Sequence, residues 1–354
     1  MTSKPDHLER TAAEPRDKSL NTVVLEHIDE INDTTRIFRL GIPRGSPPFR
    51  FLPGQWLDVY LPGIEEAGGF TITSAPRDAR TAHPPLPPPT SESENNDTAA
   101  APQDNGKGSE PQGPYVELAV QKSDNPPAAW LWRAPAPPLL GAELRVRVGG
   151  SFVWPPPGIN ARALRRAVFV AGGVGVNPLV AMLSSLAAAV PPPSSGGDLE
   201  VRFLYSLRDP GVPAAGGYRQ ASKMLFLERI ARVFREGRVR GRLAVFLTGG
   251  SADGDGEGIK EGGEEGEGQG EGGDLISCGE EEDGKELTIP FHPRRCTVED
   301  DVANAVGDTP AERRFAVVYV CGVPTMTDGF VAKLTDRRDG LGMEPHRVLC
   351  EKWW

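Results

Sequence analysis

Hydrophobic and polar positions divide the chain into two parts with different periodicities. In the first part, short runs alternate between hydrophobic and polar residues and are separated by turns rich in glycine and proline, a pattern typical of half-buried strands. We expect such strands at Thr22–Glu26, Arg36–Leu40, Leu57–Leu61, Tyr115–Val120 and Glu143–Val148. Many short strands with turns of this kind favour a small antiparallel β-barrel.

The pattern changes after the proline run at Pro155–Pro157. From there, hydrophobic runs of strand length alternate with helix-like segments, which favours a parallel sheet covered by helices. The expected strands are Ala167–Val170, Glu200–Tyr205, Leu243–Leu247 and Phe315–Val320, and the expected helices are Pro178–Ala189 and Ala221–Arg235. We therefore predict a barrel domain at residues 20–158 and an α/β domain at residues 159–354, with residues 1–19 as a disordered tail.

The most informative segment joins the first expected strand of the second domain to its helix. Gly172, Gly173 and Gly175 permit positive φ angles and the close approach of a diphosphate. The start of the following helix, with Pro178 in its first turn, attracts anions. A tight connection without a ligand is the alternative, because a glycine-rich turn alone is a weak signal. A second strand ends at Cys321, and the carboxyl ends of parallel strands meet at one edge, so both turns are expected to line one crevice.

Two segments have compositions that favour disorder. Residues 79–114 are rich in Pro, Ser, Asn and Gly, and residues 251–286 are acidic and rich in Gly, so neither buries enough hydrophobic surface to fold. The acidic segment holds 14 Asp or Glu and 2 Lys, a charge of −12, which leaves +2 for the rest of a chain with net charge −10. Without a basic stripe, nucleic-acid binding is not expected. The acidic segment is interpreted as a solubilising loop, with docking of a protein partner as the alternative.

The cysteines and the longest uncharged run bear on metal binding and on compartment. The four cysteines, Cys278, Cys296, Cys321 and Cys350, have none of the close spacings of zinc or iron–sulfur ligands, so no metal is predicted. They also give no disulfide framework, which fits a reducing compartment. The uncharged run from Ala167 to Val190 contains glycines and a proline that suit a strand and a helix better than a membrane span. Met1–Asn21 has no hydrophobic core of a secretory signal. We expect an intracellular protein, cytoplasmic or mitochondrial and not secreted.

Several motifs together resemble a known family. The barrel followed by an α/β domain, the Gly-Gly-x-Gly-x-x-Pro loop that begins at Gly172, and the Cys-Gly turn at Cys321 resemble the ferredoxin–NADP reductase superfamily. Within it, the chain is most similar to the eukaryotic oxidoreductase NAD-binding domain-containing proteins. That similarity lies in the segments Pro53–Trp56, Gly68–Pro76, Asn125–Trp130 and Cys350–Trp354.

The resemblance implies a flavin on the barrel. The superfamily holds it with an Arg-x-Tyr-Ser/Thr segment, and here Phe70 and Thr71 occupy the aromatic and hydroxyl positions. Phe70 would stack on the isoalloxazine ring and the Thr71 hydroxyl would bond to its N5 atom. Gly68 occupies the position of the arginine, which favours weaker FAD binding or binding of FMN, and Gly68→Arg is expected to tighten FAD. The other implied contacts are Thr73 and a helix start at Asn125, Ala128 and Ala129, which would hold a phosphate or act only as a structural cap.

The resemblance also assigns residues to a nicotinamide dinucleotide. They are Gly172, Gly173, Gly175, Asn177 and Pro178 at the diphosphate, Ser206 and Arg208 at the adenosine ribose, and Cys321 and Gly322 at the nicotinamide. Arg208 would accept a 2′-phosphate and Asp209 would repel it, which leaves NADH and NADPH open with a lean to NADH. Cys321 is alternatively an ordinary buried thiol. At the end of the chain, Glu351, Trp353 and Trp354 would lie over the flavin, or form a tail packed on the sheet.

These assignments imply a flavin-dependent NAD(P)H oxidoreductase that passes a hydride from nicotinamide to FAD or FMN and electrons to an unknown acceptor. The implied catalytic residues are Thr71, Cys321, Glu351 and Trp354. Two alternatives stay open: a non-catalytic nucleotide-binding protein whose flavin site has decayed, and an electron-transfer module whose acidic loop docks a basic partner protein.

Overall fold

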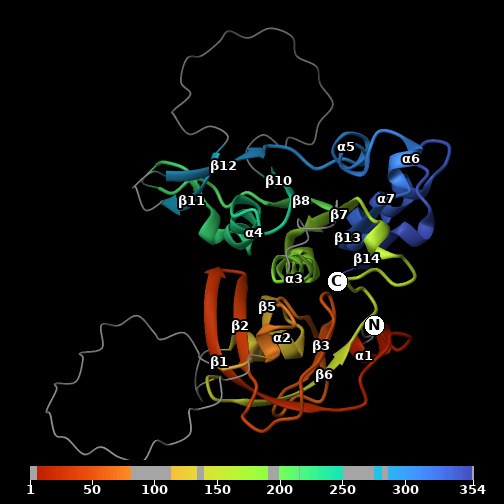
Figure 1. Cartoon of the computed structure of the whole chain (residues 1–354). Coiled ribbons are helices and arrows are strands. Elements are labelled where there is room, and N and C mark those ends of the chain that lie inside the picture. Colours follow the sequence, from red (N-terminus) through yellow and green to blue (C-terminus); the bar gives the residue numbers. More distant parts are fainter. Residues whose placement is uncertain are drawn as a thin grey trace, which may run out of the picture.

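Strands from the two parts of the chain form two separate sheets (Figure 1). The structure, a computed structural model, describes residues 6–80, 113–133, 139–189, 199–214, 216–249, 275–280 and 286–352. The first sheet is antiparallel and the second is mostly parallel with helices on both faces. The fold class expected from the sequence is therefore confirmed.

Six antiparallel strands in the spatial order β4-β3-β6-β1-β2-β5 form the barrel. Their bounds are β1 Asn21–Asn32, β2 Thr35–Gly41, β3 Trp56–Tyr60, β4 Gly68–Thr71, β5 Tyr115–Gln121 and β6 Glu143–Gly149. A bridge between Ile72 and Leu118, and a hydrogen bond of 2.8 Å from the Thr73 N–H to the Glu117 carbonyl, connect the two end strands. The sheet therefore closes on itself, with a short helix, α2 (Pro126–Trp132), beside it.

Alternation along the strands explains the barrel core. Successive side chains of a strand point to opposite faces, so every second residue faces inward. Val23 and Leu25 of β1, Phe38 and Leu40 of β2, and Leu57 of β3 are fully buried in one cluster. These are the hydrophobic positions of the alternating pattern that the sequence shows.

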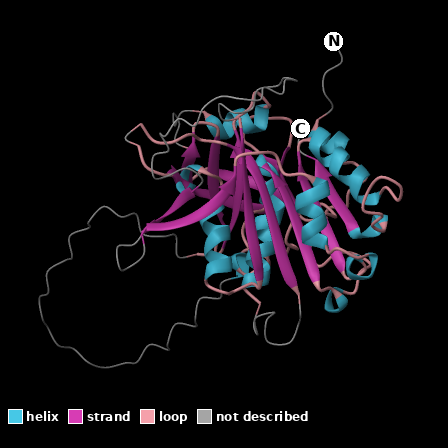
Figure 2. Ribbon diagram, turned by 90° about the horizontal axis from the view of Figure 1, so that it is seen from above, coloured by secondary structure: helices cyan, strands magenta, loops and turns pink. Residues whose placement is uncertain are grey.

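The second sheet has the strand order β14-β13-β7-β8-β10-β12-β11-β9. The strands are β7 Arg166–Gly172, β8 Glu200–Arg208, β9 Arg219–Gln220, β10 Gly241–Thr248, β11 Leu275–Glu280, β12 Glu286–His292, β13 Ala316–Gly322 and β14 Val348–Lys352. The run from β14 to β12 is parallel, and β11 pairs antiparallel with β12. Figure 2 shows these strands side by side with helices packed along them.

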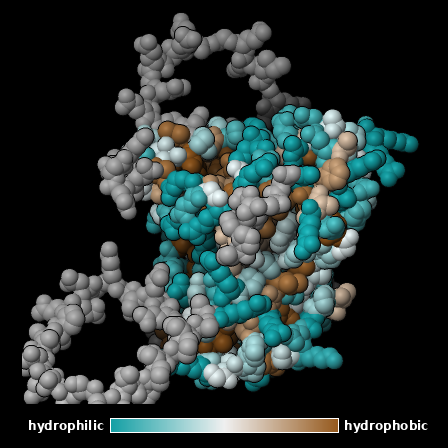
Figure 3. All heavy atoms as spheres, viewed as in Figure 1, coloured by the Kyte–Doolittle hydropathy of each residue, from teal (hydrophilic) through white to brown (hydrophobic). Residues whose placement is uncertain are grey.

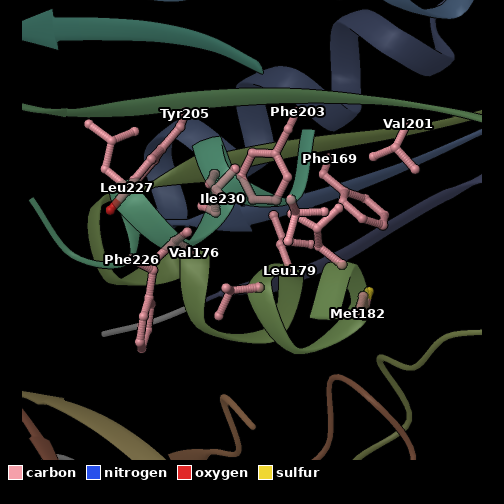
Figure 4. Packing of buried hydrophobic residues seen from close by; sticks show 14 of the residues in the cluster. Phe169, Val176, Leu179, Met182, Val201, Phe203, Tyr205, Phe226, Leu227 and Ile230 are labelled. Carbon is pink, nitrogen blue, oxygen red and sulfur yellow. The ribbon is translucent and has the colours of Figure 1, made fainter. Parts of the chain in front are cut away.

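Different helices cover the two faces of this sheet. The helices α3 Val176–Ala187 and α4 Leu227–Arg235 lie on the face towards the barrel, and α5 Ala303–Val306, α6 Pro310–Arg313 and α7 Pro324–Thr335 lie on the other (Figure 1). Phe169 packs in one cluster with Leu179 of α3 and Ile230 of α4 (Figure 4). Its neighbours Val168 and Val170 belong to the cluster on the opposite face. Burial on both faces explains the continuous hydrophobic runs of the parallel strands.

One expected helix is interrupted. The segment expected to be helical from Ala221 forms a single 3-10 turn, Ala221–Lys223, and α4 begins only at Leu227. Between them, Phe226 has a left-handed backbone with φ of +59° and is buried. A left-handed residue cannot continue a right-handed helix, so the segment divides there.

Two segments that were expected to be disordered contain regular structure. Residues 275–280 of the acidic segment form β11, which packs Ile276 into the core of the second sheet. Residues 6–19 of the expected tail include a short helix, α1 (His7–Arg10), and lie on the barrel. Residues 81–112 of the first predicted insertion, residues 251–274 and 281–285 of the second, and residues 1–5 lie outside the described residues.

Strand β5 connects the two domains. The Glu117 carboxylate accepts hydrogen bonds of 2.8 and 2.9 Å from the Arg229 guanidinium of α4, and the Ala119 carbonyl accepts one of 3.0 Å from the Asn177 side chain of α3. Burial alone would raise the pKa of Glu117, but the charge of Arg229 and the hydrogen bonds it receives hold that pKa below its ordinary value. Both helices of the barrel-facing layer are thus fixed to one strand.

Candidate functional site

A cleft of about 650 Å³ lies where the barrel meets the second domain. This volume is in the range of small-molecule and cofactor sites. The lining residues of the barrel come mainly from β4 and β5, and those of the second domain come from the loop before α3, from α3 itself and from β14. A third part of the wall belongs to the N-terminal segment, through His7, Arg10, Thr11 and Glu14.

Three buried polar atoms in this wall have no hydrogen-bond partner among the described residues. They are Oγ1 of Thr71, Oδ1 of Asn177 and Oε2 of Glu351, and all three residues line the cleft. A buried polar atom without a partner costs about 1 to 3 kcal/mol, so native structures keep few of them. The three residues come from different elements and line one cleft, so these atoms are candidate contacts for a ligand with hydrogen-bonding groups there.

The barrel side of the cleft has the chemistry that a flavin ring requires. Thr71 is buried at the end of β4 with an unpartnered hydroxyl, and Phe70, beside it, is partly exposed and lines the cleft. A planar aromatic face and a hydroxyl on adjacent residues suit an isoalloxazine ring, which stacks on its faces and accepts hydrogen bonds at its edge. The residues present therefore fit a flavin.

Gly68 is not an empty arginine position. A Cβ atom there would lie 2.4 Å from Cε2 of Phe70 and 2.6 Å from Cβ of Pro127, closer than real Cβ atoms approach other atoms. The Phe70 ring and α2 occupy the space that a side chain would need. The expectation that Gly68→Arg tightens FAD therefore lacks its structural basis, because arginine would first displace Phe70.

The helix start after Asn125 differs from the sequence-based expectation. Asn125 is the N-cap of α2, but its side chain makes no capping hydrogen bond, and the Ala129 N–H already donates to the Asn125 carbonyl at 2.8 Å. Asn125 and Ala128 line the cleft, whereas Ala129 does not. Thr73 also lies away from the cleft, because it is buried and its hydroxyl donates to Glu117 at 2.7 Å.

The glycine loop joins β7 to α3 and uses its glycines for two purposes. Gly173 has φ of +53°, and no atom lies within 4 Å of the position of a Cβ. Gly172 and Gly175 have ordinary φ angles but no room, since a Cβ on Gly175 would lie 2.2 Å from the Cys321 carbonyl oxygen. A Cβ on Gly322 would lie 3.4 Å from Cα of Gly172, so the turns after β7 and β13 touch. The glycines of these turns were expected to line one crevice, but none of them is among the residues that line the cleft.

Asn177 and Pro178 occupy the first turn of α3. Both are buried. The Asn177 side-chain N–H group donates to the Ala119 carbonyl of the barrel, and its Oδ1 atom has no hydrogen-bond partner among the described residues. Pro178 does not line the cleft, whereas Val174 of the loop before α3 does. The first turn of α3 is thus part of the domain contact as well as a candidate anion site.

Ser206 and Arg208 lie at the end of β8, next to the loop. Ser206 pairs with Gly172 in the sheet, and Arg208 is exposed. Asp209 accepts hydrogen bonds from Arg219, the shortest at 2.8 Å, and this interaction holds the pKa of Asp209 below its ordinary value. Because Arg219 balances its charge, Asp209 gives little reason to expect repulsion of a 2′-phosphate, and the lean to NADH loses its argument.

The parallel register of β13 and β14 places Cys321 beside Glu351 and Gly322 beside Lys352. Cys321 is fully buried and is not among the lining residues, so its thiol behaves as a core side chain, whereas Cys350 lines the cleft. Burial, with a further contribution from the Glu14 carboxylate, raises the pKa of Glu351 to about 8. Glu351 is therefore largely protonated at neutral pH. Trp353 and Trp354 lie outside the described residues.

The sequence-based prediction missed the N-terminal wall of the cleft. Its attachment point is Asp58, a fully buried carboxylate of β3 that accepts from His7 at 2.8 Å and from Arg16 at 2.9 Å. Arg147 of β6 is a third donor, at 2.9 Å. An acid between Leu57 and Val59 in a hydrophobic strand was the available signal, because a buried carboxylate requires partners.

Comparisons with known proteins agree with this geometry. No family model matches the chain. Oxidoreductase NAD-binding domain-containing protein 1 of Danio rerio is 32% identical over 358 residues, and the alignment covers 100% of both chains. The protein of that name from Xenopus laevis is 31% identical over 358 residues, 100% of this chain and 85% of its own.

The chain belongs to this family. Its fold is also that of a ferredoxin NADP+ reductase from Neisseria gonorrhoeae, solved with bound FAD and NADP, at a TM-score of 0.54 and 12% identity. That comparison covers 96% of this chain and 100% of the other. The family resemblance inferred from the sequence motifs is thus confirmed, and the chain is an oxidoreductase-family protein with the ferredoxin reductase-like fold.

Two further features of the described residues concern metals and membranes. No group of three or more His, Cys, Asp or Glu side chains is arranged to hold a metal ion in the described part of the chain. Within the same residues, no helix has the length and hydrophobicity needed to span a membrane. Leu52 and Val323 are among the exposed large hydrophobic side chains of the described residues, and hydrophilic residues cover much of the face in Figure 3.

Proposed function

We propose that this protein is a flavin-dependent NAD(P)H oxidoreductase with its redox site in the cleft between the barrel and the second domain. The observation that carries the proposal is that Thr71, Asn177 and Glu351, each with an unpartnered buried polar atom, all line one cleft. When bound there, a flavin would accept a hydride from a nicotinamide nucleotide and pass electrons to an acceptor. FAD and FMN both remain candidates, as do NADH and NADPH.

The barrel residues would orient the flavin ring. Phe70 lines the cleft, and its ring lies against Gly68 and packs on the barrel core. The Thr71 hydroxyl, buried beside it, would donate to the edge of the ring. Placing two reactants in a fixed relative orientation lowers the barrier of a transfer reaction without an acid or a base on the protein.

The second domain would hold the nicotinamide nucleotide. The loop at Gly173 is open on the side of its missing Cβ, and it leads directly into α3, whose first turn presents N–H groups and a partial positive charge. Ser206 adjoins this loop through its pairing with Gly172. A dinucleotide that follows the edge of the sheet would reach the cleft beside Glu351 of β14.

Glu351 would hold a proton at the cleft. Its raised pKa keeps the carboxyl largely neutral at physiological pH, and a neutral carboxyl can donate a hydrogen bond as well as accept one. Fixed charge at the nicotinamide and flavin rings would be costly in a buried site, and a neutral Glu351 avoids it. A carboxyl with a pKa near the working pH can also exchange protons with the site during turnover.

Flavin binding to a threonine variant tests the proposal. We expect the wild type to bind flavin, and Thr71→Val to weaken binding by about threefold to tenfold, the worth of one hydrogen bond. Thr327→Val is the matched control, because Thr327 is also a fully buried threonine with an unpartnered hydroxyl but lies on α7, outside the cleft. Equal flavin affinities in the two variants, or a wild type that binds no flavin, would contradict the assignment.

One observation favours a second candidate, a nucleotide-binding protein without redox activity. The closed position at Gly68 leaves that end of β4 without a charged side chain for a flavin phosphate. In that case the purified protein binds NADH or NADPH but neither FAD nor FMN. Docking of a partner through the acidic segment concerns residues mostly outside the described part of the chain, and it remains a hypothesis.

A further inference from the structure

The N-terminal segment, residues 6–17, is a built part of the cleft. Beyond the two side-chain bonds to Asp58, the Asp17 N–H donates to the Val148 carbonyl at 2.8 Å, and the Gly150 N–H donates to the Pro15 carbonyl at 2.9 Å. These two bonds pair Arg16 with Gly149 at the end of β6. The His7 hydrogen bond to Asp58 at one end, and the Arg16 ion pair and the main-chain bonds at the other, hold the segment on the barrel.

Helix α1 lies directly against the strand that carries Phe70 and Thr71. A Cβ on Gly69 would lie 2.1 Å from Cε1 of the His7 ring, so His7 occupies the face of Gly69. The same His7 ring packs edge-on against Trp56, at 5.7 Å between centroids. Arg10 follows three residues later, on the same side of the helical turn, and lines the cleft.

The cationic side chains of the cleft differ in how they are engaged. Lys352 pairs with Asp328 at 2.6 Å, and Lys122 lies 5.6 Å from the centre of the Trp132 ring. Arg10 is exposed, and its Nε donates a hydrogen bond of 3.3 Å to the Asp6 carbonyl, with no acidic partner among the described residues.

We infer that Arg10 binds the phosphate of the flavin nucleotide, an inference that rests on the proposed flavin site. A flavin nucleotide brings one or two phosphates into this cleft, and the barrel has no room for a cation at Gly68. Arg10 reaches the cleft from the segment packed on the neighbouring Gly69, and a guanidinium binds phosphate through two parallel N–H donors. The phosphate-binding charge thus comes from outside the barrel strands.

Three ligands that share one ring system test the inference. Affinities of FAD, FMN and riboflavin, which lacks a phosphate, are measured by fluorescence titration with the wild type, Arg10→Gln and Arg10→Lys. Arg10→Gln should weaken FAD and FMN by about tenfold to a hundredfold and leave riboflavin unchanged. Arg10→Lys keeps the charge and should retain part of the affinity. Lys18→Gln, an exposed cation of the adjoining stretch outside the cleft, is the control for net charge and should match the wild type.

Each other outcome has a defined meaning. Equal losses for riboflavin and FAD, or no loss for any flavin, would overturn the role of Arg10 while leaving the flavin site in place. A loss of NADH affinity alone in Arg10→Gln would assign the guanidinium to the nicotinamide nucleotide instead and also overturn it. A wild type that binds none of the three flavins would contradict the proposed function itself, and the inference would fall with it.

Discussion

The raised pKa of Glu351 predicts how stability changes with pH. Burial and the Glu14 carboxylate shift this pKa from 4.5 to about 8, so the folded protein holds a proton that the unfolded chain releases. Between these two values the unfolded state gains from ionisation and the folded state does not, so stability falls as pH rises. The slope for one group is about 1.4 kcal/mol per pH unit. The wild type should therefore lose about 2 to 3 kcal/mol relative to Glu351→Gln between about pH 6 and about pH 8.

The assay is denaturant unfolding of both proteins across that range, with the difference between them taken at each pH. The difference isolates Glu351, because other titrating groups contribute equally to both proteins. Glu14→Gln is a second test of the same pKa. Removal of the Glu14 charge should lower the Glu351 pKa, so the loss of stability with rising pH should end at a lower pH than in the wild type. A difference between wild type and Glu351→Gln that stays constant with pH would refute a neutral, buried Glu351.

Four other predictions follow from the contacts. Asp58→Asn should cost about 3 kcal/mol or more and expose the N-terminal segment to trypsin, since a neutral amide cannot replace the buried carboxylate; unchanged cleavage would count against that attachment. Gly173→Ala should cost about 1 kcal/mol through its φ of +53° and weaken NADH but not flavin in parallel titrations, and equal affinities would remove the loop from the site. Gly68→Arg should loosen flavin in the same titration, and tighter binding would show that Phe70 moves aside. Arg229→Met should destabilise the protein by about 3 kcal/mol in denaturant, with partial recovery in the double variant with Glu117→Gln; full additivity would show that the two residues do not interact.

The two kinds of sheet were readable from local sequence patterns. Alternation in β1 and β6 and continuous hydrophobic runs in β7 and β13 reflect whether one or two faces of a strand are buried, and that distinction is visible residue by residue. The two-residue strand β9 has no such pattern, because its pairing with β11 depends on segments far away in the chain.

The candidate site was only partly readable, because its parts meet through tertiary contacts. Phe70 and Thr71 were identified from a motif, and their place at the cleft agrees with it. The roles of Thr73 and Gly68 depend on neighbours, Glu117 in one case and the Phe70 ring in the other, which no motif specifies. Arg10 lay in a segment that was expected to be disordered, and the segment is ordered by contacts with distant strands, namely the buried Asp58 and main-chain bonds at Val148 and Gly150.

Hydride transfer in the flavin-loaded protein tests the central claim most directly. The measurement is anaerobic stopped-flow mixing with NADH and with NADPH, each also deuterated at the transferred position of the nicotinamide, while the visible flavin absorbance is followed. The account predicts rapid bleaching of the bound flavin with at least one nucleotide, slowed by deuterium because the hydride moves in the observed step. A protein that binds both flavin and nucleotide but shows no bleaching on mixing would contradict it.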